Sequence, residues 1–347
     1  MTWLIWRQIR TQFLAVYALV AAAAVVLALT GPRLARLTPV DGSIFAQLTE
    51  LDRFIYYSGI VVIAVVPALI GIFWGAPLVA RELENGTHRL AWNQSVTRTR
   101  WLAAKLGVAA LATAIAVGTL TLAITWWADP LDGIQSETRG SLPSRLAPVA
   151  FAMRGIVPIS YAVFALVLGV TLGVLLRRSL PAMALTLAVY VAAQIAVPFL
   201  VRPHLVPTET QISDISMETM VGLGSHGDSD VIEFEARAAD PSDWVISNET
   251  IDPEGLVTGL PTWFADCMPG PPRAPAAGAP DDELEPPPAN PLEDCFDRLT
   301  DEGYQQRLVV QPVSHFWPLQ WAETGLYAAA SALLAGLAFW WTRRRLS

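Results

Sequence analysis

The stretch that decides the fold is "LGVAALATAIAVGTLTLAITWW", Leu106 to Trp127, which contains no charged residue. A helix of about 20 apolar residues crosses the roughly 30 Å hydrocarbon core of a bilayer. Inside lipid every backbone N–H and C=O must be satisfied within the segment, so such a run must be helical. Working outward along the chain, five further runs are long and apolar enough: Leu14–Thr30, Ile60–Val79, Ile156–Leu176, Met183–Val201 and Thr324–Trp341. The sequence therefore predicts an all-α polytopic membrane protein with six transmembrane helices.

The composition agrees with a membrane protein. Of 347 residues, 53% are hydrophobic and 16% are charged, and the mean hydropathy is +0.42, which does not suit a soluble protein of this length. The first run is longer than the apolar core of a secretory signal and leads into Pro32 and Arg33, so we expect a retained helix. The six runs contain no carboxylate and no lysine. We therefore expect no buried ion relay, which disfavours an ion-coupled transporter.

The placement of lysine and arginine predicts the orientation, because short cytoplasmic loops carry an excess of these residues. With the N-terminus inside, the inside segments hold twelve: Arg7, Arg10, Arg81, Arg89, Arg98, Arg100, Lys105, Arg177, Arg178, Arg343, Arg344 and Arg345. The two short outside loops hold six: Arg33, Arg36, Arg53, Arg139, Arg145 and Arg154. We therefore expect both termini in the cytoplasm of the cell, and the protein in the plasma membrane.

A long acidic segment, residues 202–320, separates the fifth run from the sixth and lies outside on this topology. It holds 22 of the 31 acidic residues and both cysteines, Cys267 and Cys295. Since disulfides persist in oxidising compartments, we expect these two cysteines to form one bridge. Alternating or β-rich stretches around 229–237, 243–251 and 306–312 predict strands. The segment between the cysteines, with nine prolines, should be irregular. We therefore expect a small mixed α+β or irregular extracytoplasmic domain.

Three shorter features complete the layout. Residues 1–13 place Trp3, Trp6 and Phe13 at helical spacing, which fits an amphipathic helix lying in the interface or an extension of the first span. Pro67 and Gly71 predict a kink in the second span. Residues 143–158 are too polar to cross alone and predict a short interfacial helix, with the Arg154 side chain reaching the interface.

Motifs for soluble-enzyme chemistry are missing. The sequence has no G-x-x-x-x-G-K-[ST] phosphate loop, no G-x-G-x-x-G after a strand, no H-E-x-x-H and no G-x-S-x-G. The acidic stretch around His226, Asp228 and Asp230 fits a solvated surface better than a metal site. We therefore predict no catalytic residue, no metal and no cofactor on this chain.

The polar interruption between runs two and three, "RELENGTHRLAWNQSVTRTRW" at residues 81–101, predicts a surface helix. Asn85-Gly86 signals a turn, Thr87 is placed to cap a helix over 88–94, and Ser95 or Thr97 to cap the next helix. We expect Glu82, Glu84 and Arg89 to be offered to a partner. The net charge over residues 81–105 is +3, which also fits anchoring on anionic lipid but is too small for nucleic-acid binding.

The stretch "ARELENGTHRLAWNQSVTRTRWLAAKL" resembles the segment between spans two and three of type 2 ABC transporter permeases, the membrane subunits of an exporter superfamily. A Glu, a Gly-Thr pair, a leucine-bearing helix, a Ser/Thr-Arg and a Lys recur there in this order. They match Glu82 or Glu84, Gly86, Thr87, Leu90, Gln94, Val96, Thr97, Arg98 and Lys105. The resemblance implies that residues 81–101 are a coupling helix that docks on a separate ATPase. One lysine against 22 arginines agrees with a high-GC, actinobacterial-like source.

The resulting hypothesis is the permease subunit of an ATP-driven exporter. Its parts are an interfacial helix (1–13), five spans with the coupling segment (14–201), the outside domain (202–320), and the sixth span with a basic tail (321–347). ATP and Mg²⁺ would bind the partner ATPase, and a second permease chain would complete the pathway within the membrane lipids. The uncharged runs suggest an apolar or amphipathic cargo such as a lipid, peptide or drug. The alternative is a membrane-anchored binding, sensing or immunity subunit that does not transport.

Overall fold

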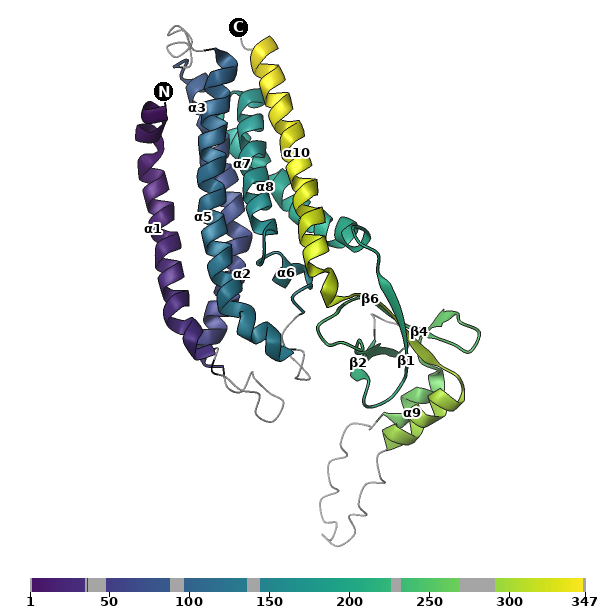
Figure 1. The fold of residues 1–347 in the computed structure, drawn as a ribbon. Helices are drawn as coiled ribbons and strands as arrows, with labels where there is room; N and C mark the ends of the chain where they lie inside the picture. The colour runs from purple at the N-terminus through teal and green to yellow at the C-terminus, as the bar shows by residue number, and fades with distance from the viewer. Residues whose placement is uncertain are drawn as a thin grey trace, which may run out of the picture. The chain divides into compact units, whose positions relative to one another are not determined.

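The computed structural model describes residues 2–34, 36, 48–87, 97–135, 144–225, 232–268 and 291–345. The chain divides into two compact units. A helical unit comprises the chain up to Pro207 and again from Val313, and an inserted unit comprises Thr208–Pro312 (Figure 1).

Among the described residues, six helical stretches are long and apolar enough to cross a membrane, in agreement with the six predicted spans. The first turns of α1 and the last turns of α10 lie at the same end of the helical unit (Figure 1). The stretches are α1 (Thr2–Leu34); α2 (Glu50–Leu69) continued by η1 (Ile70–Gly75) and α3 (Ala76–Glu84); α5 (Arg98–Gln135); α7 (Val157–Leu176); α8 (Ser179–Ala196) continued by η2 (Val197–Val201) and η3 (Arg202–His204); and η6 (Val313–His315) with α10 (Phe316–Arg344).

Helix α7 is the centre of the helical unit. It is buried over 72% of its span, against 17% for α1, and it packs against α10, α5, α8 and the α2–α3 stretch. Glycines allow close approaches to the α2–α3 stretch: a Cβ added at Gly169 would collide with the carbonyl oxygen of Gly71, and one at Gly173 would lie 2.6 Å from the carbonyl oxygen of Ala76. Small residues spaced four apart let membrane helices approach backbone to backbone. Gly169 and Gly173 on α7 thus form a seam with Gly71 and its neighbours.

Where the sequence predicts a kink, at Pro67 and Gly71, the structure has the π-helical turn η1. Pro67 lies inside α2 and has no N–H to donate. The N–H of Ile70 bonds to the carbonyls of both Val66 and Pro67 at the entry to the wider turn. Such π-turns often mark functional positions in helices.

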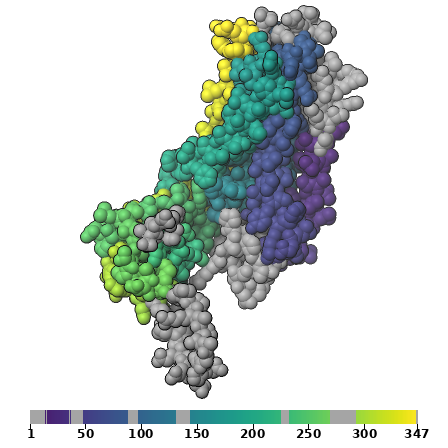
Figure 2. All heavy atoms as spheres, turned by 180° about the vertical axis from the view of Figure 1, so that it is seen from behind, coloured from purple at the N-terminus to yellow at the C-terminus, as the bar shows by residue number. Residues whose placement is uncertain are grey.

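Helix α1 is continuous from Thr2 to Leu34, so the helix predicted over residues 1–13 joins the first span without a break, and its position in the membrane interface stays a prediction. Figure 2 shows α1 (purple) along the edge of the helical unit, beside α2.

The short helix expected before the fourth span is present as α6 (Pro148–Phe151). The expectation that Arg154 reaches the interface is wrong: the residue is 3% exposed and interacts electrostatically with Tyr56 and Asp129. This burial lowers the pKa of the Arg154 guanidinium, an effect that Tyr56 and Asp129 oppose.

In its described part, the inserted unit holds two antiparallel sheets and one α-helix. The larger sheet has the order β1 (Glu209–Asp214), β6 (Gln305–Gln311), β4 (Trp244–Ile251), β5 (Val257–Thr258), and the smaller sheet pairs β2 (Met220–Ser225) with β3 (Ile232–Ala236). In the register, Glu209 faces Val310 and Ile251 faces Gln305. Its core is formed by buried side chains of both sheets, of α9 (Pro291–Asp301), of the segment after β1 and of the 3₁₀ helix over Thr262–Cys267: Ile215, Phe234, Phe264, Phe296, Leu299, Leu308 and Val310.

The predicted disulfide between Cys267 and Cys295 is present, and it joins the 3₁₀ helix η4 (Thr262–Cys267) to α9. The three predicted strands correspond to β3, β4 and β6. The irregular segment expected between the cysteines falls mostly on residues 269–290, which lie outside the described residues. Its last part is helical, since α9 starts at Pro291. The unit is also shorter than residues 202–320, since Arg202 and Gln320 both belong to the helical unit.

Candidate functional site

The two ends of the predicted coupling segment are ordered as the sequence indicates. Helix α3 ends at Glu84, and Asn85 and Gly86 form the predicted turn, with Gly86 at a φ of 70° that favours glycine. At the other end, Thr97 Oγ1 accepts from the N–H of Arg100 at 3.3 Å and caps α5, which begins at Arg98. Thr87 is exposed. The predicted docking residues Arg89, Leu90 and Gln94 lie in 88–96, outside the described residues.

Glu82 is bound within the chain. Its Oε1 lies 2.5 Å from Nζ of Lys105, which also donates to the carbonyl of Leu78 at 3.2 Å and lies over the ring of Trp101. The Lys105 side chain is 5% exposed, so the pair is largely removed from solvent. One ion pair therefore ties the last turn of α3 to the first turns of α5, the two helices that flank residues 88–96.

Glu84 also has a partner within the chain. Its Oε2 accepts from the hydroxyl of Ser179 at 2.9 Å and from the N–H of Ser179 at 3.2 Å. The first N–H groups of a helix have no partner within it and attract negative charge, so Glu84 caps α8. Glu82 and Glu84 thus each hold α3 to a neighbouring helix, contacts that the sequence did not predict, while Glu84 remains exposed and docking by both residues stays a prediction.

The end of α10 joins the same cluster. Arg343 Nε donates to Thr99 Oγ1 at 3.4 Å, and Arg177 Nη2 donates to the carbonyl of Arg345 at 2.9 Å. Arg177 adopts a left-handed conformation, with φ 55°, and ends α7 before the turn into α8. Helices α3, α5, α7, α8 and α10 are thus linked by polar contacts at the end of the unit that carries residues 81–101.

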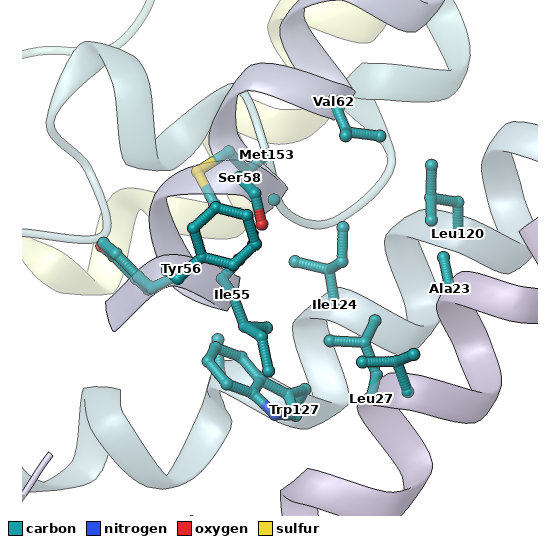
Figure 3. A pocket seen from close by; sticks show the side chains of 14 residues that line it. Ala23, Leu27, Ile55, Tyr56, Ser58, Val62, Leu120, Ile124, Trp127 and Met153 are labelled. Atoms are coloured by element: carbon teal, nitrogen blue, oxygen red, sulfur yellow. The ribbon is translucent and has the colours of Figure 1, made fainter. Parts of the chain in front are cut away.

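An apolar pocket opens between α1, α2 and α5 (Figure 3). Leu27, Ile55, Leu120, Ile124 and Trp127 contribute much of its wall. Its volume is about 200 Å³. The lining is almost wholly hydrocarbon, so the pocket suits an apolar group.

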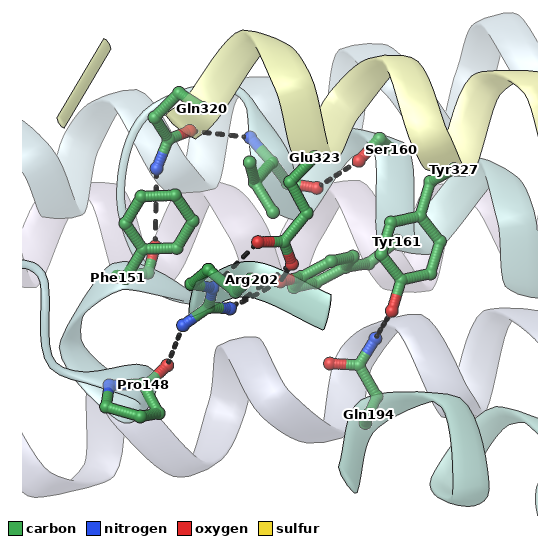
Figure 4. A network of polar contacts seen from close by, with 10 residues as sticks. Pro148, Phe151, Ser160, Tyr161, Gln194, Arg202, Gln320, Glu323 and Tyr327 are labelled. Atoms are coloured by element: carbon green, nitrogen blue, oxygen red, sulfur yellow. Dashed lines mark hydrogen bonds and ion pairs between the residues drawn. The ribbon is translucent and has the colours of Figure 1, made fainter. Parts of the chain in front are cut away.

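A buried polar network lies where η3 and α10 meet α7 (Figure 4). Arg202 binds Glu323 through two contacts, Nε to Oε2 at 2.7 Å and Nη2 to Oε1 at 3.2 Å, and neither side chain is exposed. Tyr161 donates to Glu323, and Arg202 also donates to the carbonyl of Pro148 at 3.3 Å. Gln320 Oε1 accepts from the N–H groups of Ile156 and Val157 at 2.9 and 3.0 Å and so caps α7.

This network corrects the expectation that the spans hold no buried carboxylate or lysine. Glu323 is fully buried and Lys105 is 4% exposed. Glu323 and Lys105 each come directly before a predicted apolar run, and Arg202 comes directly after one. They were missed because the helical stretches extend beyond the apolar runs. Because both charges are paired, the network gives no evidence of an ion relay. Within the described residues, no group of His, Cys, Asp and Glu could hold a metal ion.

Comparison with known families decides the identity. The model of the family described as ABC-2 membrane transporter related matches residues 15–202, more than half of the chain. The chain belongs to this family. The matched part of the ABC-2 chain contains spans one to five and the whole of residues 81–101, while the inserted unit and α10 lie beyond it. No curated protein and no solved structure matches the chain.

Membership makes the chain a multi-pass membrane protein whose family points to the permease part of an ABC transporter. It is consistent with a transport subunit that is not itself an enzyme and that works with an ATPase partner. Sequence reasoning found the turn, the cap at Thr97 and the disulfide. It missed the partners of Glu82 and Glu84 and the Arg202–Glu323 pair.

Proposed function

We propose that this ABC-2 family chain is the permease subunit of an exporter, driven by an ATPase on a separate chain that docks on residues 81–101 at the cytoplasmic face. The observation that carries the proposal is the position of this segment. It lies inside the family match, and it connects α3 to α5. Near its two ends these helices are joined by the ion pair between Glu82 Oε1 and Lys105 Nζ, which lie 2.5 Å apart. ATP and Mg²⁺ would be bound by the ATPase, with no cofactor on this chain.

The contacts suggest how movement of the segment would reach the spans. A push on residues 81–101 acts on α3 and α5 together, because Lys105 and Glu82 join them. Helix α3 acts on α8 through Glu84 and on α7 through the glycine seam. Two permease chains, each with an ATPase, would then rock between inward-facing and outward-facing states.

The proposed cargo is apolar or amphipathic, such as a lipid, a peptide or a drug. Its support is the hydrocarbon lining of the pocket between α1, α2 and α5.

Charge reversal at Arg89 tests the docking site. The full chain is co-expressed with the ABC ATPase whose reading frame adjoins its own, and ATPase recovery on the tagged permease is measured. We expect Arg89→Glu to abolish co-purification. Arg36→Glu makes the same change in charge at an exposed residue at the other end of the helical unit and should retain the ATPase. Retention by Arg89→Glu, or an adjoining region without an ATPase gene, contradicts the proposal.

A second change separates docking from coupling. Lys105→Met removes the cation that joins α5 to Glu82 but leaves residues 88–96 unchanged. We expect the ATPase to co-purify normally while cargo-dependent stimulation of ATP hydrolysis in vesicles is lost. Normal stimulation in this variant would mean that the pair does not transmit movement.

The alternative function, an extracytoplasmic binding or sensing module, is supported by a separate observation. Residues Thr208–Pro312 form a compact unit with its own apolar core and disulfide. If this were the working part, the isolated unit would bind the effector of the full chain. The Arg89→Glu change would then leave activity intact.

A further inference from the structure

The pocket between α1 and α2 continues into a second one. The second pocket, of about 240 Å³, is lined by Val16, Leu19, Val66 and Phe73 among others. Both pockets are lined by Ala23, Val62 and Leu120. They are therefore two parts of one groove, which we call the α1–α2 groove.

The groove exists because α1 is held to α5 more than to α2. Tyr17 donates to the carbonyl of Ala112 at 2.9 Å, and Trp127 Nε1 donates to Thr30 Oγ1 at 2.9 Å. The wall on α1 runs from Val16 to Leu27, about 17 Å at 1.5 Å per residue, and the wall on α2 and η1 runs from Phe54 to Trp74, about 30 Å. The shorter wall is about as long as one leaflet of the hydrocarbon core is thick, and the longer wall matches the full core thickness of about 30 Å.

One end of the groove is positively charged. Beyond Leu27 on the same helix, Arg33 Nη1 lies 3.7 Å from Asp52 Oδ2 and donates to Thr49 Oγ1 at 3.4 Å. The Arg33 side chain remains 53% exposed, and Arg36 beyond it is also exposed. Asp52 is buried, and the exposed carboxylate of Glu50 pairs with Arg53 at 3.0 Å, so the charged groups that face solvent at this end include the guanidinium groups of Arg33 and Arg36 beside this neutral pair. A phosphate placed here would meet these cations, while a chain attached to it would enter the groove.

We propose that the α1–α2 groove binds a phospholipid, with one acyl chain between the helices and the anionic headgroup at Arg33 and Arg36. All three helices that line the groove are membrane spans, so hydrocarbon is what surrounds it. A helix of a second copy is about 10 Å wide and does not fit pockets of 200–240 Å³, whereas an extended alkyl chain does. The inference needs only the membrane location and does not depend on the proposed export.

Photocrosslinking of the full chain in vesicles tests this site. The vesicles contain phosphatidylcholine with a minor share of phosphatidylglycerol that carries a diazirine on its acyl chain, and crosslinked residues are mapped by mass spectrometry. We expect labels to concentrate on groove residues of α1, α2 and α5. Gly59 lines the groove and has open space beside it, so Gly59→Leu should fill it and remove most of the label. Gly107 has the same open space on α5 outside the groove, and Gly107→Leu should keep the label.

The headgroup is tested by exchanging the labelled lipid. We expect phosphatidylglycerol to be preferred over labelled phosphatidylcholine by about fivefold for each arginine, and the preference to fall in Arg33→Gln and Arg36→Gln. Equal labelling by both lipids would overturn the headgroup assignment. If Gly59→Leu does not elute as a single species, Ala23→Phe fills the same groove.

Two results would overturn the site as a whole. The first is label spread over exposed apolar faces such as α8 and unchanged by Gly59→Leu, which would mean bulk lipid only. The second is crosslinking of cysteines placed in the groove between two copies of the chain, which would assign the groove to a second copy. Neither result bears on whether an ATPase docks on residues 81–101.

Discussion

At the scale of single residues, the Arg202–Glu323 pair shows how this ABC-2 protein accommodates charge inside its spans. Taking two charges out of water costs several kcal/mol for each ion unless their hydrogen bonds are satisfied. Here the guanidinium meets both carboxylate oxygens, the Tyr161 hydroxyl and the carbonyl of Pro148, and it lies 4.3 Å from the ring centre of Phe151. The pair joins η3, at the exit to the inserted unit, to α10, where the chain returns.

Removing one member of the pair should be costly. Glu323→Leu leaves Arg202 charged, buried and without its carboxylate, so we expect a loss of about 3–5 kcal/mol, seen as a lower midpoint of thermal unfolding in detergent. The double variant Arg202→Met with Glu323→Leu removes both charges and should recover much of this loss. Glu50→Ala, at the 90% exposed partner of Arg53, should change stability by about 0–1 kcal/mol. An equal effect of Glu323→Leu and Glu50→Ala would contradict the importance of the buried pair.

The sequence could not supply this pair, because the partners lie 121 positions apart and each adjoins an apolar run. Local signals did predict residues whose partners are near in sequence. The turn at Gly86 and the cap at Thr97 depend on neighbours within three or four positions. The sequence did not show that Glu84 accepts a hydrogen bond from Ser179, because the two residues lie 95 positions apart.

At the scale of elements, the closest packing is between α7 and the π-turn η1. Gly169 and Gly173 on one side meet Gly71 and Gly75 on the other, and an added Cβ at Gly169 would lie 2.6 Å from Ala76 N. Packed membrane helices depend on such contacts, since lipid gives no hydrophobic drive for them to associate. The seam thus holds the second span, at its π-turn, against the centre of the helical unit.

A methyl group in the seam should separate these helices. We expect Gly169→Ala to lower the unfolding midpoint and the yield of monodisperse protein, because its Cβ would meet backbone atoms that cannot move aside alone. Gly107→Ala adds the same methyl group to a helix where nothing lies within 4 Å. It should be neutral or stabilising by up to about 1 kcal/mol, as alanine has the higher helix propensity. Similar stability of the two variants would show that the seam can relax.

The elements themselves were largely predictable, and the reason is physical. Membrane helices must be long and apolar, so all six were found from composition, although their ends extend beyond the apolar runs. In the inserted unit, β3, β4 and β6 carry alternating or β-branched residues, whereas β1 (Glu209–Asp214) is largely polar and exposed and β5 is two residues long. Their pairing with β6 and β4 comes from tertiary contacts that local pattern does not encode.

At the scale of the whole molecule, the chain builds two units with different means of stabilisation. The helical unit relies on apolar spans, a glycine seam and paired buried charges. The inserted unit is acidic, and its small core is closed by a disulfide between η4 and α9. Because the two units have separate cores, a change in one core should be confined to its own unit.

Reduction of the disulfide tests this independence. Opening the bridge between Cys267 and Cys295, which lie 28 positions apart in the sequence, should cost the inserted unit roughly 3–4 kcal/mol of stability, mainly through the entropy of its unfolded state. Hydrogen exchange on the full chain should then show faster exchange of amides in β6 and α9 after reduction or in Cys267→Ser. Amides of α7 should exchange at the same rate in both forms, and Ser216→Ala is a control change in the same unit that leaves the bridge intact. Faster exchange in α7 on reduction would show that the stability of the two units is coupled.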